Sequence, residues 1–340
     1  MNWNKGLSAR YYCSIVNPIT WHDTGETFNI TGGSISHSLS DLMESADVDC
    51  VRYPQNTERW IRVYLDARQS GAAEHIAMFT GLATSPDRNI DGLYETNKVQ
   101  CYSVLKPAQD VLLPRGWYAP VGIDGAKLIK RLLGVTPAPV DYDPTVEAAP
   151  TLKRAIIAED GESNLSMAHK ILTAIGWRFR ITGDGVIHIC PTATEHTELF
   201  DSFENDSIEP VLTVTADWYG CPNVFRATQG DASAEARDES ESLLSIPNRG
   251  REVWMEETNV NLSERETLLE YAKRRLKEEQ QVAYIVKYDR RYRPDLYVSD
   301  IVELHCPAQG IDGEFVITSQ SIELGYAART SEEVQNVAKV

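Results

Sequence analysis

The sequence contains no long hydrophobic run. No apolar stretch approaches the roughly 20 residues that a membrane-spanning helix needs. The N-terminus, Met1 to Gly6, also lacks the apolar stretch of a signal peptide. We therefore expect no membrane insertion, with the cytoplasm as the default place of synthesis and residence.

Cysteine is sparse and has no metal-binding spacing. No two of the six cysteines lie within four residues of each other, which excludes the spacing of a zinc ribbon or a thioredoxin-type pair. Several stand inside strand-like runs, for example Cys190 and Cys306. We interpret the cysteines as reduced thiols packed in the interior.

Positive charge is also scarce. The chain has 33 Lys and Arg residues against 50 Asp and Glu residues, a formal net charge of −17. Affinity for nucleic acid comes largely from neutralised phosphates, so this balance disfavours direct DNA binding. It suits a surface that must not hold DNA, although many soluble proteins share it.

Catalytic motifs are absent as well. The sequence has no Gly-x-Ser-x-Gly elbow, no phosphate loop ending in Gly-Lys-Ser and no His-Glu-x-x-His. Gly183-Asp184-Gly185 resembles half a phosphate or calcium loop, but no helix starts directly after it. A hairpin turn between Trp177–Ile181 and Val186–Cys190 is the favoured interpretation.

Three polar clusters are the remaining candidates for a metal or carboxylate site. They are His22 with Asp23 and Glu26, His196 with Glu195 and Glu198, and the carboxylates between Asp231 and Glu241. None shows the spacing of a helical ligand pair, and solvated loops have the same composition. We predict no catalytic, cofactor-binding or metal-binding residue and no cofactor, and hence that the chain is not an enzyme.

The length of 340 residues and the 42% hydrophobic content indicate two or three domains with real cores. Residues 1–110 form a β domain in this prediction, with turns at Gly32-Gly33, Gly71 and Asp91-Gly92. The expected strands are Ser34–Leu39, Val48–Tyr53, Trp60–Leu65, His75–Leu82 and Lys98–Val104.

Residues 111–198 are predicted to form a small α/β domain. Asp124 is expected to cap a helix that ends at Gly134, and Ser163 a helix that ends at Gly176. A proline-rich connector from Pro137 to Pro150 separates the two helices. The hairpin described above follows the second helix.

Residues 199–326 are predicted to form a second β domain with one helix at about 263–281, capped by Ser263 and Glu266. The expected strands are Val211–Thr215, Asn223–Thr228, Val282–Tyr288, Tyr297–Cys306 and Glu314–Leu324. Gly230–Glu241 is interpreted as an exposed acidic loop, and Leu268, Leu269, Ala272 and Leu276 as the buried stripe of the helix. Residues 327–340 are expected to be a polar C-terminal tail.

Aromatic residues are present in all three regions. The tryptophans Trp21, Trp60, Trp117, Trp177, Trp218 and Trp254 stand mostly beside predicted strands. Packing in a core or an interface explains this distribution better than a sugar-stacking platform does.

Several segments, in this order along the chain, resemble the hub proteins of phage and phage-like tails of Gram-positive bacteria. In the first domain they are Ser34–Leu39, His75–Ala83 with its Phe-x-Gly step, and Cys101–Leu105. In the middle they are Ile156–Asp160, Ser163–Ile175 and Trp177–Ile181. In the third they are Asp217–Tyr219, Pro222–Val224, Ala272–Leu276, Val298–Val302 and Gly313–Thr318.

The resemblance implies a mainly β, α+β protein with two tail-tube-like β-barrel domains flanking the small α/β domain. It implies a baseplate hub in the virion, assembled in the host bacterial cytoplasm as a homotrimer. Such a ring adapts a hexameric tail tube to a threefold tail tip, and DNA passes through its channel without specific binding. The implied partners are the tail tube protein, the distal tail protein, the tape-measure protein and a tail-tip spike or fibre protein.

Two other classes stay open. A receptor- or carbohydrate-binding tail component should present an exposed aromatic platform. An enzyme, for instance a glycosidase, should lose turnover when a single carboxylate is mutated.

Overall fold

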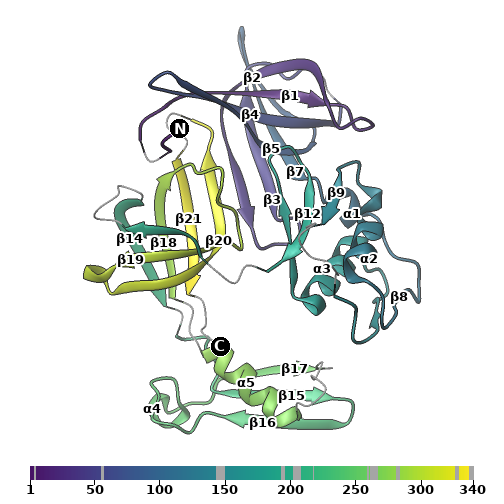
Figure 1. Ribbon diagram of the computed structural model, residues 1–340, viewed down its shortest axis with the longest axis vertical. Coiled ribbons are helices and arrows are strands. Elements are labelled where there is room, and N and C mark those ends of the chain that lie inside the picture. The colour runs from purple at the N-terminus through teal and green to yellow at the C-terminus, as the bar shows by residue number, and fades with distance from the viewer. Residues whose placement is uncertain are drawn as a thin grey trace. The chain divides into compact units, whose positions relative to one another are not determined.

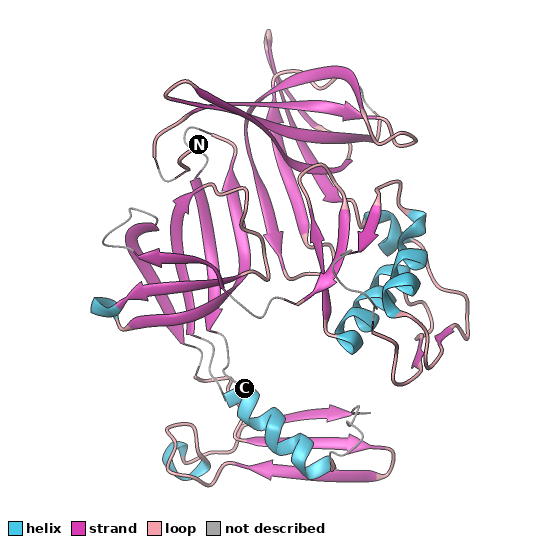
Figure 2. Cartoon of the chain, viewed as in Figure 1, coloured by secondary structure: helices cyan, strands magenta, loops and turns pink. Residues whose placement is uncertain are grey.

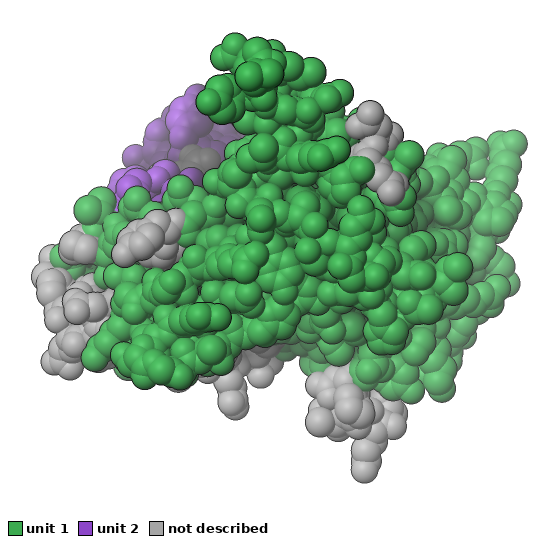
Figure 3. Space-filling view, turned by 90° about the horizontal axis from the view of Figure 1, so that it is seen from above, with its two compact units in different colours: residues 1–211, 288–334 green, residues 212–287, 335–340 purple. Residues whose placement is uncertain are grey.

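The computed structural model describes residues 1–3, 5–54, 57–142, 150–192, 196–201, 208–216, 218–258, 260, 267–280, 284–325 and 329–336. The chain forms two compact units. Unit 1 comprises Met1–Val211 and Tyr288–Val334, and unit 2 comprises Leu212–Lys287 and Gln335–Val340 (Figure 3). The three-domain division at residues 110 and 198 stays a prediction.

Unit 1 begins with a group of antiparallel strands that we call the first β module. Its strands are β1 Ser8–Val16, β2 Asp23–Ser38, β3 Glu44–Cys50, β4 Arg59–Gln69, β5 Ala72–Ala83, β6 Asp87–Asp91 and β7 Tyr94–Ser103 (Figure 1). The hydrogen-bonded pairs run β1–β4–β5–β7–β3–β2 and return from β2 to β1. Six strands thus form a closed circuit of pairing, which leaves few unpaired edges.

The second β module lies near the C-terminal end of the sequence. Its strands are β13 His196–Asp201, β14 Ile208–Ala216, β18 Tyr284–Arg291, β19 Ile301–Cys306, β20 Ile311–Glu323 and β21 Arg329–Asn336. They pair in the order β13–β19–β20–β21–β18–β14. Strand β20 also pairs with β2 from Ser34↔Glu323 to Ser38↔Ser319, so both modules belong to one 13-stranded sheet.

A smaller α/β part joins the two modules in sequence and contains helices, drawn in cyan in Figure 2. Its elements are α1 Lys106–Asp110, β8 Tyr118–Ala119, α2 Gly125–Leu132, the 3-10 turn η1 Leu133–Val135, β9 Val140–Tyr142, β10 Ile156–Ile157, α3 Asn164–Ile175, β11 Trp177–Ile181 and β12 Ile187–Pro191. Asp124 accepts a hydrogen bond from the backbone N–H of Lys127, and Ser163 from that of Ser166. Gly176 ends α3 at φ 70°. Both predicted N-caps and the hairpin are therefore confirmed.

Unit 2 is a three-stranded sheet with a helix on one face. Its elements are β15 Val224–Gln229, β16 Ala232–Arg237, α4 Ile246–Arg249, β17 Trp254–Thr258 and α5 Leu268–Gln280. The strand order is β16–β15–β17, with β16 antiparallel and β17 parallel to β15. The predicted capping residues Ser263 and Glu266 lie outside the described residues.

The interior of the first β module is apolar. Its buried residues include Ile61, Phe79, Cys13, Cys50 and Cys101. All six cysteines are free thiols, and four of them are buried. The prediction of reduced, packed thiols is confirmed for those four, while Cys190 and Cys221 are half-buried.

Two predicted loops are wrong because the chain pairs there. Residues Ala232–Arg237, expected within an exposed acidic loop, form β16 against β15. Residues Arg329–Asn336, expected within the polar tail, form β21 of the large sheet, and Thr330, Glu332 and Val334 are buried there. In both segments buried and exposed positions alternate with a period of two, but the buried side chains are mostly small or polar, so the hydrophobic pattern of a strand is weak.

Other boundaries shift for local reasons. Gly32-Gly33 is not a turn, because it forms an irregular step in the β2–β3 register, and Gly33 adopts φ 130°. The strand predicted at Tyr297–Cys306 begins only at Ile301. Leu269, predicted to lie in the buried stripe of the helix, is exposed on α5. The first helix continues past its expected end into η1, and the proline-rich connector contains β9.

A further loop, between β19 and β20, is shorter than expected. After the 3-10 turn η2 Pro307–Gln309, β20 already begins at Ile311. The chain is mainly β, as predicted, with one large sheet. None of the helices in the described part is both long and apolar enough to cross a membrane.

Candidate functional site

The turn between β11 and β12 docks on the outside of the first β module. The hydroxyl of Thr80 donates to the carbonyl of Gly183 at 2.7 Å. Nη2 of Arg62 and Nε1 of Trp21 donate to the carbonyl of Asp184, at 2.8 and 3.0 Å. In sequence, Gly183-Asp184-Gly185 resembles half a phosphate or calcium loop. In the structure, the carbonyl groups of Gly183 and Asp184 anchor the α/β part to the first β module.

Two glycines make this close docking possible. A Cβ atom on Gly183 would stand 1.8 Å from the carbonyl oxygen of Ala77, and one on Gly185 2.8 Å from Cβ of Thr80. Gly185 also adopts φ 78°, a conformation that favours glycine. The Gly-Asp-Gly sequence is therefore required by the contact as well as by the turn.

Arg62 organises the module side of this contact. Its buried guanidinium donates to the Thr80 hydroxyl at 2.9 Å and to the Asp23 carboxylate at 3.0 Å. The same carboxylate accepts a hydrogen bond from the hydroxyl of Tyr64 at 2.8 Å. The carboxylate of Asp23, one of the metal-ligand candidates, therefore forms an ion pair with Arg62.

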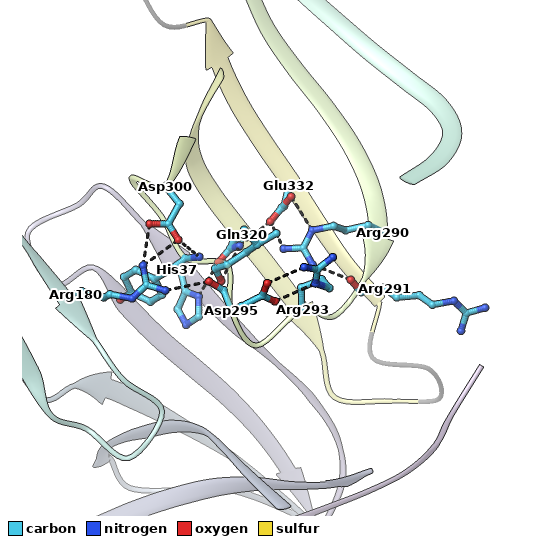
Figure 4. Close-up of polar contacts among 11 residues, drawn as sticks. His37, Arg180, Arg290, Arg291, Arg293, Asp295, Asp300, Gln320 and Glu332 are labelled. Carbon is cyan, nitrogen blue, oxygen red and sulfur yellow. Dashed lines mark hydrogen bonds and ion pairs between the residues drawn. The ribbon is translucent and has the colours of Figure 1, made fainter. Parts of the chain in front are cut away.

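A buried polar network, which we call the junction, lies where β2 meets β20 (Figure 4). Arg290 and Glu332 form a two-point ion pair with both side chains at most 1% exposed, and one of its hydrogen bonds measures 2.8 Å. Gln320 donates to Glu332 at 2.6 Å and accepts from Nδ1 of His37 at 3.0 Å. A hydrogen-bonded chain thus runs from the second β module to the first.

The junction continues on the first module through a second titratable residue. Nε2 of His37 lies 3.9 Å from a carboxylate oxygen of Glu44, and both side chains are buried. Burial lowers the pKa of His37 to about 4 and raises the pKa of Glu44 well above its ordinary range. Both shifts favour the uncharged forms, as expected for groups removed from water.

Asp300 connects the α/β part to the second β module. Its carboxylate is 2% exposed and accepts hydrogen bonds from two arginines of β11, Arg178 at 2.9 Å and Arg180 at 2.8 Å. The contact with Arg180 is drawn in Figure 4. It also accepts the backbone N–H of Tyr297 at 2.9 Å. Charge-assisted hydrogen bonds in a buried setting fix orientation strongly. The three parts of unit 1 are therefore held to one another by specific polar contacts.

The remaining polar clusters do not converge on a metal. Within the described residues, no group of three or more His, Cys, Asp or Glu side chains could hold one. Glu195 and the side chains of His196 and Glu198 lie outside that description. In the acidic segment, Glu235 pairs with Arg226 at 2.8 Å, and Asp238 accepts from Ser240, Ser242 and Gln280.

The tryptophans divide between cores and surfaces. Trp60 and Trp177 are buried, and Trp21 packs edge-on against Trp60 with ring centroids 5.3 Å apart. Trp218 and Trp254 are about half exposed. The packing interpretation is confirmed for the two buried residues and for Trp21.

Tyr12, Tyr64 and His75 form a partly exposed aromatic stack on β1, β4 and β5. Their ring centroids are 5.3 Å apart for the two tyrosines and 4.5 Å for Tyr64 and His75, with nearly parallel planes. Since the rings cover one another's faces, they do not form the flat platform on which a sugar stacks.

Sequence reasoning missed both the docking contact of Arg62 and the junction. Arg62 gave a weak signal, because a charge stands between apolar Ile61 and Val63 within a strand pattern. Arg290, Glu332 and Gln320 gave none, because each looks like an ordinary surface residue of a polar segment. Their pairing depends on contacts between strands that are far apart in the sequence.

No family model and no curated protein matches the sequence. Solved structures do resemble the fold. The tail protein from Neisseria meningitidis MC58 is 13% identical with a TM-score of 0.72, and the match covers 97% of each chain. The 43 kDa tail protein of prophage MuSo2 from Shewanella oneidensis is 14% identical with a TM-score of 0.66, covering 96% of this chain and 98% of that one.

A third similar structure is the prophage tail protein gp18 from Listeria monocytogenes EGD-e. It is 10% identical with a TM-score of 0.55, and the match covers 97% of this chain and 95% of that one. Across nearly its full length, the chain therefore has the fold of phage tail proteins. Because the three come from different bacteria, the fold does not tie the chain to one group of hosts.

Proposed function

We propose that the chain is a structural hub of a phage-type tail baseplate. The observation that carries this proposal is the fold shared with tail proteins over 97% of both chains. In this proposal the first and second β modules are the two tube-type β-barrel domains, and the α/β part is the small domain between them in sequence. Three copies form a ring that adapts a hexameric tail tube to a threefold tip.

The contacts within unit 1 suit this role. Three chains with two β modules each present six modules, which resolves a mismatch between sixfold and threefold symmetry. Such an adaptor needs its two modules at a fixed spacing. The His37–Gln320–Glu332 chain and the Asp300 ion pairs supply that rigidity, because a buried polar network is stable in only one arrangement.

The hub proposal brings a location and a set of partners. The protein belongs to the virion tail and is assembled in the host cytoplasm. It contacts the tail tube protein, the distal tail protein, the tape-measure protein and a spike or fibre protein. The net charge of −17 per chain suits a channel through which DNA passes, because negative walls repel phosphate.

The oligomeric state tests this function directly. Light scattering on the purified full chain should give three times the 38.1 kDa chain mass, and negative-stain images should show a threefold ring. The ring should not retard duplex DNA at physiological salt. A stable monomer at all concentrations, or conversion of a glycan substrate that one carboxylate mutation abolishes, would overturn the proposal.

The second candidate is a receptor- or carbohydrate-binding tail component without catalysis. The exposed neighbouring aromatics Trp218 and Tyr219, 54% and 80% exposed, are the observation that favours it. A glycan array decides between the two, with Tyr219→Ala as the matched variant. Binding that this change abolishes would support the second candidate, and absence of binding would remove it.

A further inference from the structure

Unit 2 has two open sheet edges. Strands β16 and β17 flank β15, and in the part of the chain that the structure describes neither pairs with any further strand. An open edge exposes backbone N–H and C=O groups that can pair with a strand of another chain.

The β16 edge borders a groove against helix α5. The groove has a volume of about 490 Å³ and is lined on the helix side by Lys273, Leu276, Lys277 and Gln280. Residues Ala232, Ala234 and Ala236 share the β16 face that packs toward α5, since Ala236 belongs to the core beneath the helix. Small side chains along this edge leave space beside the helix for the side chains of an added strand.

The helix wall of the groove carries two lysines, and its strand side carries Arg237 with Glu235, Asp238 and Glu239. Lys273 and Lys277 lie one turn apart on α5, and neither has an ion pair within the described residues. A strand entering the groove is therefore favoured when it brings carboxylates to this wall.

The opposite edge of the same unit has the matching chemistry. In β17, Met255 and Glu257 share the α5 face, because Glu257 accepts hydrogen bonds from Tyr271 at 2.8 Å and Arg275 at 3.3 Å. Arg275 also pairs with Glu278 and Glu279, which places these carboxylates on the β17 flank of the helix. One flank of α5 thus carries two lysines, and the other carries carboxylates that are paired with Arg275.

Strand direction also matches. Because β16 is antiparallel and β17 parallel to β15, two units side by side in one orientation align β16 of one with β17 of the next in antiparallel fashion. A symmetric β16–β16 pairing would instead bring four lysines together, which like-charge repulsion disfavours.

We propose that the β16 edge of unit 2 binds strand β17 of a second copy of this chain, so that the sheets of neighbouring copies continue into one another. The small core of the unit fits this role. Its seven buried residues include three alanines, and small domains with such cores are commonly stabilised by association. The pairing rests on the proposed function only for the number of copies in the ring.

Engineered disulfides test the pairing in the full chain. Ala234→Cys is combined with Met255→Cys in one variant and with Glu257→Cys in a second, which covers two registers on the same face. Within one copy β16 and β17 are separated by β15, about 9.5 Å apart, beyond the ~7 Å reach of a disulfide. Any bond between the two new cysteines must therefore join two copies.

We expect covalent multimers on a non-reducing gel from at least one double variant, but not from either single variant or from the parent chain with its native thiols. Multimers from Ala234→Cys alone would indicate symmetric pairing and overturn the proposal. A trimer without cross-links in either double variant would overturn it as well and leave the hub function standing. A monomer would overturn both.

Charge reversal gives an independent measurement. Lys273→Glu with Lys277→Glu should raise the concentration needed for association roughly tenfold. Lys98→Glu with Lys153→Glu makes the same change in net charge at two exposed lysines of unit 1 and serves as the control. Equal effects of the two double variants would contradict a role for the two lysines of the groove.

Discussion

The two β modules of unit 1 both bury apolar side chains, but they differ in whether they hold a fully buried ion pair. The first is filled with apolar side chains and thiols, among them Ile61, Phe79 and Cys101. The second contains the fully buried ion pair of Arg290 and Glu332. An apolar interior tolerates small changes in shape, whereas a buried charge is stable only with its partner in place.

The two modules therefore differ in what fixes the arrangement of their strands. The first closes its circuit of strands on itself, so its pairing is complete without the second. The second depends on polar contacts that extend through Gln320 to His37 of the first. The junction thus couples the arrangement of the modules to the stability of the second one.

The largest effect is expected from breaking the buried ion pair. Glu332→Ala leaves the Arg290 guanidinium buried without its carboxylate, which should lower the free energy of unfolding by about 3–5 kcal/mol. Urea denaturation followed by tryptophan fluorescence measures this loss.

The double variant Arg290→Met with Glu332→Leu is the matched control. It replaces the ion pair by apolar side chains and should be more stable than the single variant, because no uncompensated charge remains. A single variant as stable as the parent would show that the second module does not depend on its buried charge.

The pH dependence of the junction should be smaller, and it sharpens the comparison. Because the pKa of His37 is lowered to about 4, its contribution is present above pH 6.5 and is lost as the pH falls toward 4. Because the pKa of Glu44 is raised, its contribution is present below about pH 4.5 and is lost as the pH rises. Between pH 4.5 and 6.5 the two contributions oppose each other.

Removing one of the two titratable groups should reveal the pH dependence of stability that the other one contributes. Glu44→Gln should lose up to about 2–3 kcal/mol of stability when the pH falls from 6.5 to 4.5. His37→Asn should instead lose stability as the pH rises over the same window. Urea denaturation at several pH values checks both, and identical slopes in the two variants would contradict this assignment.

A substitution in the docked β11–β12 turn is expected to cost somewhat less stability than the changes at the junction. Gly183→Ala places a methyl group against the carbonyl of Ala77, so the turn must move away, at about 2 kcal/mol. Gly134→Ala is the control, because nothing lies within 4 Å of its added Cβ. Thermal unfolding that gives equal melting temperatures for both variants would show that the docking contact contributes nothing.

Local signals in the sequence predicted the local structure well. Asp124 and Ser163 cap helices, Gly176 ends α3, and Gly183-Asp184-Gly185 turns a hairpin, because each effect acts within a few residues. The mainly β character follows from alternation along β3 and β7 in the same way.

What the sequence did not show depends on distant partners. Strand β21 looks polar because Thr330 and Glu332 occupy buried positions, and only the contacts with β20 and β18 explain them. Strand β16 looks like an acidic loop because alanines alternate with polar residues, a weak hydrophobic pattern. The docking role of Gly183 depends on Ala77, which no local pattern reveals.

The smallest predicted effect probes the apolar module by itself. Ile61→Val removes one methyl group from a fully buried side chain and should cost about 1 kcal/mol of stability. The control is Ile19→Val, the same change at a side chain that is 91% exposed, where almost no effect is expected. The loss at Ile61 should be equal at pH 5 and pH 7.5, since the atoms removed are uncharged and surrounded by apolar groups. Denaturation curves in which the Ile61→Val loss grows on acidification would mean that protonation at the junction loosens the first module too. The two modules would then behave as one cooperative unit, and the first module would not be independent of the second.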